Sequence, residues 1–234
     1  MILDGKIALV TGGTGALGSV IAEGLIAEGC VVYASSPHEK EGTSGRERLR
    51  NHVRIVKADI TDEKEVKNLF DVIMRDSSRI DIVVNTVGGF VPGKPLRDVT
   101  IHDWDLMMNI NLKSAFLSTR EAVRRMDGQS YGRIINISAM AALSPGPGRA
   151  PYTISKAGVS LLTEIVSKEV KGTGITVNAI APSIIVTPAN LKSMPGEDSS
   201  KWVTPDQLAD LVCYLCSPSA VAINGTTLKA FGGM

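Results

Sequence analysis

The residues with the clearest chemical potential are a tyrosine and a lysine that lie four positions apart. Tyr152 and Lys156 begin a segment with helical periodicity, so both side chains belong on one face of a helix. A tyrosine with a pKa of about 10 is a poor acid or base at neutral pH, and a nearby ammonium group lowers this pKa because it favours the phenolate. The pair predicts a group that can protonate a developing alkoxide.

A glycine-rich segment near the N-terminus has the composition of a phosphate-binding loop. Residues 11–18 read T-G-G-T-G-A-L-G, directly after an apolar run and at the start of a helical pattern. Glycines let the backbone turn and approach a pyrophosphate, and the N–H groups and positive dipole end of the helix favour its charge. We expect this loop to bind a dinucleotide.

The elements that must position these residues alternate between strand-length apolar runs and helical patterns. The expected strands are Lys6–Thr11, Val31–Ser35, Val53–Lys57, Ile80–Asn85, Arg133–Ser138, Ile175–Ile180 and Thr226–Ala230. The expected helices are Leu17–Ala27, Glu63–Met74, Trp104–Met126, Tyr152–Val170 and Pro205–Cys216.

This alternation predicts an α/β fold of one domain that spans residues 1–234. Nearly continuous apolar strands indicate a parallel sheet buried on both faces, and right-handed crossovers then give a doubly wound sheet of about seven strands. Ligands of such sheets bind at the carboxyl ends of the strands. Two loops that follow strands, Gly88–Pro95 and Ser144–Pro151, should border that crevice.

Composition excludes several classes of function. The 25 Lys and Arg residues nearly balance the 24 Asp and Glu residues, so the sequence offers no electrostatic footprint for nucleic acid or an anionic membrane. No apolar run approaches the length of about 18 residues that a membrane span needs, and Asp4 and Gly5 interrupt any signal-peptide core. We expect a cytoplasmic protein with a small-molecule substrate.

Cysteine and histidine residues give no sign of a disulfide framework or a metal site. The three cysteines are an odd number, and Cys213 and Cys216 lie at the spacing of a buried helix face, which favours core packing over redox or metal chemistry. The histidines are scattered, without the spacing that metal ligands show.

With the strand ladder, the glycine loop and the Tyr152-x-x-x-Lys156 pair together, the sequence resembles the short-chain dehydrogenase/reductase family over nearly its whole length. The resemblance implies a Rossmann fold and an NAD(P)(H)-dependent oxidoreductase that transfers a hydride between nicotinamide and a small carbonyl or alcohol substrate. By overall pattern, 3-oxoacyl-acyl-carrier-protein reductases are the commonest such relatives. The resemblance also implies a homotetramer, or a homodimer, paired through Trp104–Met126 and Tyr152–Val170.

The resemblance assigns roles to individual residues. Lys156 would also hold the nicotinamide ribose, and Asn111 would support a water-mediated proton relay. Ala16 stands where the family usually has its middle glycine. The cofactor-binding residues that the resemblance implies are Gly12, Thr14, Gly15, Ala16, Leu17, Gly18, Ser35, Ser36, Asp59, Ile60, Asn85, Thr86, Val87, Lys156, Pro182, Ile185 and Thr187.

The end of the second strand bears on the choice of cofactor. A carboxylate there would bond the ribose 2′-hydroxyl and repel a 2′-phosphate, but Ser36 fills the acidic position. Ser35, Ser36, His38 and Lys40 can donate to a phosphate. This pattern favours NADP(H) over NAD(H), although Gly15 replaces the loop arginine of many NADP-dependent relatives.

One member of the family's catalytic set is missing. Counting thirteen residues back from Tyr152 reaches Ala139, where relatives carry a serine that donates a hydrogen bond to the substrate oxygen. Ser138 lies one position short, and neighbouring residues of a strand point to opposite sides. Ser138 can replace the missing donor only if the strand end bulges or turns.

Two alternatives remain open at this point. The stretch after Thr187, with T-P, K-S-M-P and W-x-T-P in order, is similar to dihydropteridine reductases, which keep the tyrosine and lysine but lack the serine. A protein that lost catalysis together with the serine and kept a regulatory nucleotide site is the second alternative. The presence of Tyr152, Lys156 and Asn111 weighs against it.

Overall fold

The computed structural model describes residues 1–37 and 53–234, and in these residues seven parallel strands form one sheet. The strand order is β3-β2-β1-β4-β5-β6-β7, so the chain runs outward from β1 to one edge and then from β4 to the other. The strands are β1 (Ile7–Thr11), β2 (Val31–Ser36), β3 (Val53–Lys57), β4 (Ile82–Asn85), β5 (Gly132–Ile137), β6 (Ile175–Pro182) and β7 (Thr227–Ala230).

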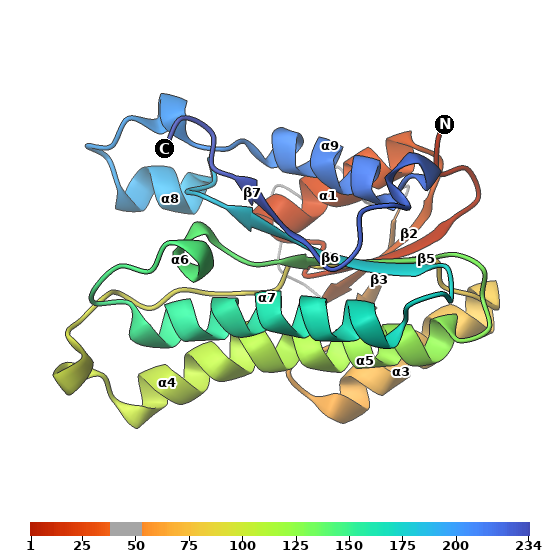
Figure 1. Ribbon diagram of the computed structural model, residues 1–234, viewed down its shortest axis with the longest axis horizontal. Coiled ribbons are helices and arrows are strands. Elements are labelled where there is room, and N and C mark those ends of the chain that lie inside the picture. The colour runs from red at the N-terminus through yellow and green to blue at the C-terminus, as the bar shows by residue number, and fades with distance from the viewer. Residues whose placement is uncertain (38–52) are drawn as a thin grey trace.

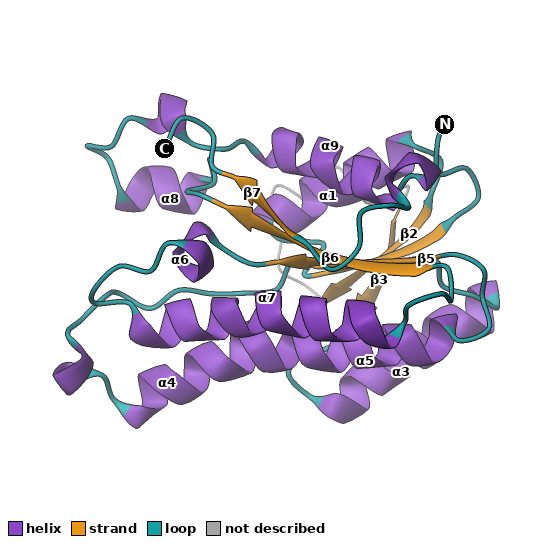
Figure 2. Ribbon diagram, viewed as in Figure 1, coloured by secondary structure: helices purple, strands orange, loops and turns teal. Residues whose placement is uncertain are grey.

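Helices cover both faces of this sheet (Figures 1 and 2). Helices α1 and α9 lie on one face, and α3, α5 and α7 lie on the other (Figure 1). The helices are α1 (Ala16–Ala27), α3 (Glu63–Ser77), α4 (Ile101–Met107), α5 (Ser114–Met126), α6 (Met140–Leu143), α7 (Ala150–Glu169), α8 (Pro188–Ser193) and α9 (Pro205–Cys216), with short helical turns at Leu96–Asp98, Ser199–Lys201 and Pro218–Ala220. The prediction of a doubly wound α/β sheet is confirmed.

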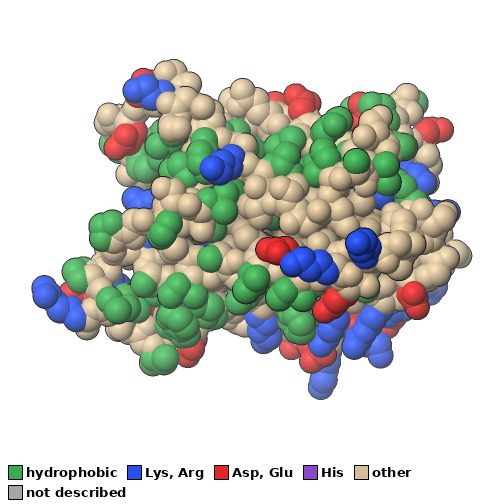
Figure 3. All heavy atoms as spheres, viewed as in Figure 1, with side chains coloured by type: hydrophobic (Ala, Val, Ile, Leu, Met, Phe, Trp, Pro, Cys, Tyr) green, Lys and Arg blue, Asp and Glu red, His purple; other side chains and the backbone are tan. Residues whose placement is uncertain are grey.

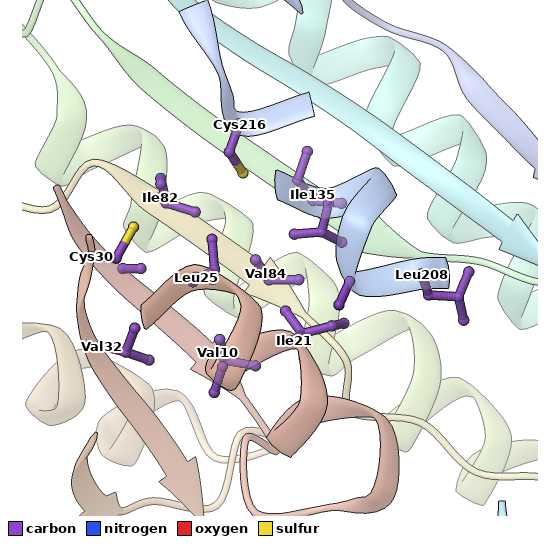
Figure 4. Close-up of a cluster of buried hydrophobic side chains, with 14 of the residues drawn as sticks. Val10, Ile21, Leu25, Cys30, Val32, Ile82, Val84, Ile135, Leu208 and Cys216 are labelled. Carbon is purple, nitrogen blue, oxygen red and sulfur yellow. The ribbon is translucent and has the colours of Figure 1, made fainter. Parts of the chain in front are cut away.

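Each face of the sheet has its own apolar core. Figure 4 shows the core beneath α1 and α9, where Ile21 and Leu25 pack over strand residues such as Val10 and Val84. The strands that fill this layer are buried along their whole length, as a central parallel strand must be. Cys216 belongs to this core and is free, as are the other two cysteines. The preference for core packing over redox chemistry at Cys216 agrees with this position.

The helix expected over Trp104–Met126 is divided into three parts. A capping box between Thr100 and Asp103 starts α4 at Ile101, earlier than predicted. The segment η2 (Met108–Lys113) is a π-helix, and the α-helical ladder resumes in α5. A π-helical turn inserts a residue into the ladder without ending the apolar face, so sequence periodicity does not reveal it.

Three observations bear on the other expectations from sequence. Among the described residues, no helix is long and apolar enough to cross a membrane. Across residues 1–37 and 53–234, no group of three or more His, Cys, Asp or Glu residues is arranged to hold a metal ion. His38 and Lys40, which we expected near a cofactor phosphate, lie outside the described residues.

Candidate active site

Helix α7 carries the predicted tyrosine and lysine and directs both toward the carboxyl end of the sheet. Pro151 lies in its first turn, where the missing N–H group of proline is not needed. The ring of Tyr152 meets the ring of Phe90 edge to face, with 5.1 Å between the centroids. Phe90 comes from the loop after β4, so this contact brings the loop over Tyr152.

Lys156 is buried and held by the end of β5. Its side chain is only 5% exposed, and Nζ donates a hydrogen bond of 2.8 Å to the carbonyl oxygen of Ile137. Burial disfavours the charged form and lowers the pKa of Lys156 to about 8. The ammonium group is therefore close to its titration point at mildly alkaline pH.

The titration of Tyr152 differs from the expectation. Burial raises the pKa of its phenol above the ordinary value, and the charge that opposes this rise comes from Arg149. The pKa of Tyr152 is therefore not lowered, contrary to the expectation from the nearby Lys156, whose Nζ donates to the carbonyl oxygen of Ile137. A protonated phenol suits the role of proton donor at neutral pH.

Asn111 lies in the π-helical segment η2 and joins three parts of the site. Its side-chain oxygen accepts from the backbone N–H of Gly89 at 2.9 Å, and its amide donates to the Gly89 carbonyl and to Ser155 Oγ. A Cβ atom at Gly88 would lie 2.8 Å from Asn111 Oδ1 and 2.9 Å from Lys156 Nζ. Asn111 and Lys156 thus lie close together on either side of a glycine.

Ser138 does not face the crevice. Its Oγ donates to the backbone carbonyl of Lys156 at 2.9 Å and lies 2.8 Å from Ser160 Oγ, and the residue is only 2% exposed. The turn that Ser138 would need to reach a substrate is absent from this described strand end. We propose that Ser138 fastens α7 to β5 rather than donating to substrate, which leaves Ala139 without a hydroxyl replacement from this position.

The glycine loop leaves no room for a side chain at Gly12, Gly13 or Gly18. A Cβ atom at Gly18 would lie 2.3 Å from the Gly12 carbonyl oxygen, and one at Gly13 would lie 2.7 Å from Ala34 Cβ. Gly12 has φ of 65°, a conformation that favours glycine. Helix α1 begins beside this loop without a side-chain cap, and Gly15 and Ala16 are exposed.

This geometry fits a dinucleotide. The first amide groups of a helix have no partners within the helix, and in the part of the chain that the structure describes no side chain caps those of α1. They are available to a phosphate, as are the exposed backbone positions at Gly15 and Ala16. Ala16, which stands where the family usually has a glycine, is exposed, so its methyl group is not packed inside the protein. Thr14 and Leu17 belong to the same turn.

The segment after β4 lies against the glycine loop. Thr86 Oγ1 donates to the Thr11 carbonyl at 2.6 Å, and a Cβ atom at Gly12 would meet Val87 at 2.9 Å. Asn85 is placed differently, because its side-chain amide donates to Asn136 and Thr119 within the core. The structure therefore leaves the Asn85 backbone, rather than its side chain, at the predicted cofactor site.

The adenosine side of the predicted site follows β2 and β3. Ser35 Oγ accepts from the backbone N–H of Gly12 at 3.1 Å, so Ser35 supports the glycine loop. Ser36 is buried at the end of β2. Asp59 is exposed and accepts from Thr61 in the turn before α3, whereas Ile60 is buried.

The predicted nicotinamide side follows β6. Pro182 ends the strand, Ile185 pairs with Val203, and Thr187 caps the short helix α8 by accepting from Asn190. The C-terminal segment closes this side, since Ser183 N donates to the Ala230 carbonyl at 3.0 Å. Pro182, Ile185 and Thr187 thus lie along the segment that connects β6 to α8.

Comparison with known proteins decides what this arrangement is. The family model described as short chain dehydrogenase matches residues 6–198. The chain belongs to the short-chain dehydrogenase family. It is 33% identical to the 3-oxoacyl-[acyl-carrier-protein] reductase of Rickettsia conorii over 99% of this chain and 98% of that protein. It is 29% identical to the cyclopentanol dehydrogenase of a Comamonas species over 99% of this chain and 97% of that protein.

Solved structures agree with this assignment. The crystal structure of gox2181 superimposes with a TM-score of 0.91 at 28% identity and covers 99% of this chain and 96% of that chain. As a member of the short-chain dehydrogenase family, the protein is an NAD(P)-dependent oxidoreductase. The relatives favour a carbonyl reductase over the dihydropteridine reductase alternative.

Several residues of this short-chain dehydrogenase site were not predicted from sequence. The ring of Phe90 meets that of Tyr152 edge to face, Gly89 and Ser155 hydrogen-bond to Asn111, and Ser160 lies within hydrogen-bond distance of Ser138. Arg149 acts on the Tyr152 phenol. The loop composition at Gly88–Pro95 signalled proximity to the crevice, but no spacing rule pointed to these particular contacts.

Proposed function

We propose that the protein reduces a small carbonyl compound of the 3-oxoacyl type with NADPH. The observation that carries this proposal is the position of Lys156 and Asn111 on either side of Gly88, with Tyr152 one helical turn before Lys156 on α7. Relatives that are 33% and 34% identical over nearly the whole chain are 3-oxoacyl-[acyl-carrier-protein] reductases, which supports the same substrate class.

The proposed chemistry divides among the chain's own residues. When bound, the nicotinamide supplies the hydride. Tyr152, whose raised pKa keeps it protonated at neutral pH, donates the proton from its phenol to the carbonyl oxygen. Lys156 holds the nicotinamide ribose and, with Asn111 across Gly88, returns a proton to Tyr152 through water. Phe90 excludes solvent from one edge of the tyrosine ring.

The residues assigned to the cofactor follow the same proposal. Gly12 to Gly18 and the start of α1 bind the pyrophosphate, and Thr86 and Val87 border it. Asp59 and Ile60 border the adenine, and Pro182, Ile185 and Thr187 border the nicotinamide. Ser36 stands in place of a repelling carboxylate at the end of β2, which supports NADPH over NADH.

We also propose that the whole chain acts as one domain that assembles as a homotetramer, or a homodimer, in the cytoplasm. A groove of about 770 Å³ lies between α4, η2, α5 and α7 and includes Leu106, Phe116 and Leu162. Figure 3 shows hydrophobic side chains gathered over the helices at lower left, and Ile101 and Leu161 are among the exposed apolar residues. The cytoplasmic location is supported by the three cysteines, which are all free, as is usual in a reducing compartment. Sedimentation at micromolar concentration tests the assembly, and a mass near 25 kDa would contradict it.

Oxidation of NADPH and NADH, followed at 340 nm against a substrate panel, tests the reaction. The panel contains an acetoacetyl thioester, a diketone and quinonoid dihydropterin. We expect turnover of the thioester or diketone, with a higher kcat/KM for NADPH than for NADH. Turnover of dihydropterin alone would overturn the substrate class, and absence of turnover on all three would overturn the proposed function.

A further inference from the structure

Phe90 is an aromatic residue of the loop after β4, and its ring meets the ring of Tyr152. The two ring planes lie at 89° to each other with 5.1 Å between the centroids, which is an edge-to-face geometry that aromatic pairs prefer. Phe90 is 53% exposed and belongs to neither apolar core of the sheet. The contact with Tyr152 is therefore not a result of core packing.

The backbone just before Phe90 is held by Asn111. The side-chain oxygen of Asn111 accepts from the N–H of Gly89 at 2.9 Å, and its amide donates to the carbonyl of Gly89 at 3.1 Å. This carbonyl belongs to the same planar peptide unit as the N–H of Phe90. Asn111 thus fixes the peptide plane next to the Cα atom that carries the Phe90 ring.

The other end of the loop is joined to α7 and α4. The backbone N–H of Lys94 donates to the carbonyl of Gly148, just before α7, at 2.8 Å, and Lys94 Nζ lies 2.7 Å from Asp103 Oδ2 on α4. Between the two ends, Pro92 has a fixed φ and restricts Val91 to extended conformations. The loop consequently has little freedom to move relative to α7.

Tyr152 is held both by its backbone and by its ring. Ser155 Oγ donates to the backbone carbonyl of Tyr152 at 2.8 Å, and the side-chain amide of Asn111 donates to the same Oγ at 3.0 Å. Phe90, which follows the Gly89 peptide that Asn111 binds, contacts the ring. The same asparagine therefore acts on the backbone of Tyr152 through Ser155 and on its ring through Phe90.

From these contacts we infer that Phe90 is a positioning residue, which keeps the ring of Tyr152 in the orientation that proton transfer requires. The inference rests on the proposed function, in which Tyr152 is the proton donor. A phenol side chain has several rotamers, and it donates its proton only from those in which the hydroxyl reaches the substrate oxygen. A neighbouring ring that limits this rotation raises the fraction of molecules that are ready to react.

Single-turnover kinetics of Phe90→Ala and Phe90→Tyr test the inference. The rate of NADPH oxidation is measured with enzyme in excess and substrate saturating, for the acetoacetyl thioester and for the diketone, because this rate reports the chemical step rather than product release. In Phe90→Ala we expect the rate to fall by about threefold to tenfold on both substrates, a factor that the free energy of an edge-to-face pair can supply. Phe90→Tyr keeps the ring and should keep the wild-type rate. The dissociation constants of NADPH and substrate should not change, because the inference assigns Phe90 no contact with either.

Leu96→Ala is the matched control, because Leu96 is an apolar residue just beyond the same loop and is 72% exposed. It should keep the wild-type rate. Equal rates in Phe90→Ala and the wild type, or equal losses in Phe90→Ala and Leu96→Ala, would overturn the inference while leaving the proposed function intact. A loss in Phe90→Tyr as large as that in Phe90→Ala, or a loss on one substrate only, would overturn it as well.

The ionisation of the Tyr152 phenol provides a second readout that needs no substrate. Burial raises the pKa of this phenol, and the charge of Arg149 opposes the rise. Of the other charged groups around it, Lys156 lies one turn further along α7, and Lys94, which lines the same small cavity as Tyr152, is paired with Asp103. Replacement of Phe90 leaves all four groups in place, so it changes only the access of water to the phenol.

The absorbance of phenolate is titrated in the wild type, in Phe90→Ala and in Leu96→Ala, and the titration of each protein's Tyr152→Phe counterpart is subtracted. The Tyr152 midpoint should fall in Phe90→Ala, because water then reaches the ring, and should be unchanged in Leu96→Ala. This result would support the inference even if no substrate is reduced, an outcome that would overturn the proposed function only. An unchanged midpoint in Phe90→Ala would overturn the inference.

Discussion

The cofactor end of this site is shaped by the backbone, whereas the substrate end is shaped by side chains. Around the glycine loop, shape is set by backbone that excludes side chains, as at Gly18, where a Cβ atom would meet Gly12 at 2.3 Å. Around Tyr152, shape is set by side chains from separate loops, such as Phe90 and Arg149. Backbone-defined sites tolerate few changes, whereas side-chain-defined sites can change substrate without a change of fold.

Removal of the Tyr152 hydroxyl should have the largest effect on the substrate end. In Tyr152→Phe we expect kcat to fall by about 10²–10⁴-fold, because the proton donor is lost. The dissociation constant for NADPH should change by no more than about threefold, since the ring and its contact with Phe90 remain. Steady-state kinetics and fluorescence titration with NADPH measure the two quantities.

Tyr214→Phe is the matched control, because Tyr214 lies exposed on α9, in the layer on the opposite face of the sheet from α7. It should behave as wild type. Near-normal turnover in Tyr152→Phe would contradict the assignment of the proton donor.

A side chain added in the glycine loop should lower the affinity for NADPH, whereas Tyr152→Phe lowers kcat. Gly18→Ala forces the loop away from the Gly12 carbonyl, so we expect NADPH affinity to fall by about a hundredfold. Ala16→Gly, which removes an exposed methyl group from the neighbouring position, should stay within about threefold of wild type. Equal affinities for the two variants would show that the loop is not held by this close approach.

Lys156 is assigned to both the cofactor end and the substrate end of the site, and it should make the free energy of unfolding depend on pH. Because its pKa falls from 10.5 to about 8 on folding, the folded protein binds fewer protons than the unfolded chain between these values. This contribution to stability is complete above pH 10.5 and is lost as the pH falls through 8, and it amounts to about 3 kcal/mol.

Urea unfolding of the wild type and Lys156→Met between pH 8 and 10.5 measures this contribution. The wild type should gain about 3 kcal/mol relative to the variant over this range. Cys30, whose pKa is raised to about 12 by burial, acts in the opposite direction but equally in both proteins. Parallel pH dependences in the two proteins would show that Lys156 is not desolvated.

The smallest expected effect is a gain of function. Ala139→Ser adds the missing hydroxyl at a position that is only 5% exposed and directly precedes α6. We expect turnover of a simple diketone to rise by about tenfold, within the range that one oxyanion donor supplies. Ser138→Ala should not lower the ratio of diketone to thioester turnover, since Ser138 bonds to α7. A selective loss in Ser138→Ala would restore Ser138 as a donor.

This contrast also explains what the sequence can predict. The strand ladder and the glycine loop depend on local patterns, namely apolar runs, helical spacing and glycines next to a strand end, and the observed sheet confirms the predicted strands. The contacts of Phe90, Ser160 and Arg149 depend on how loops far apart in sequence approach each other, which no local pattern encodes. The direction of Ser138 and the division of the 104–126 helix likewise depend on packing.

The position of Asn111 depends on the number of residues in the π-helical segment Met108–Lys113. An α-helix turns by about 100° per residue, so a single residue removed from this segment would convert it into ordinary helix and rotate everything before it relative to α5. Regular α-helical hydrogen bonding would be the more stable local structure, but the side-chain amide of Asn111 would no longer reach Gly89 and Ser155. The extra residue of the π-helical segment is therefore required to keep Asn111 in contact with Gly89 and Ser155. Its deletion would give a regular α-helix and a loss of activity.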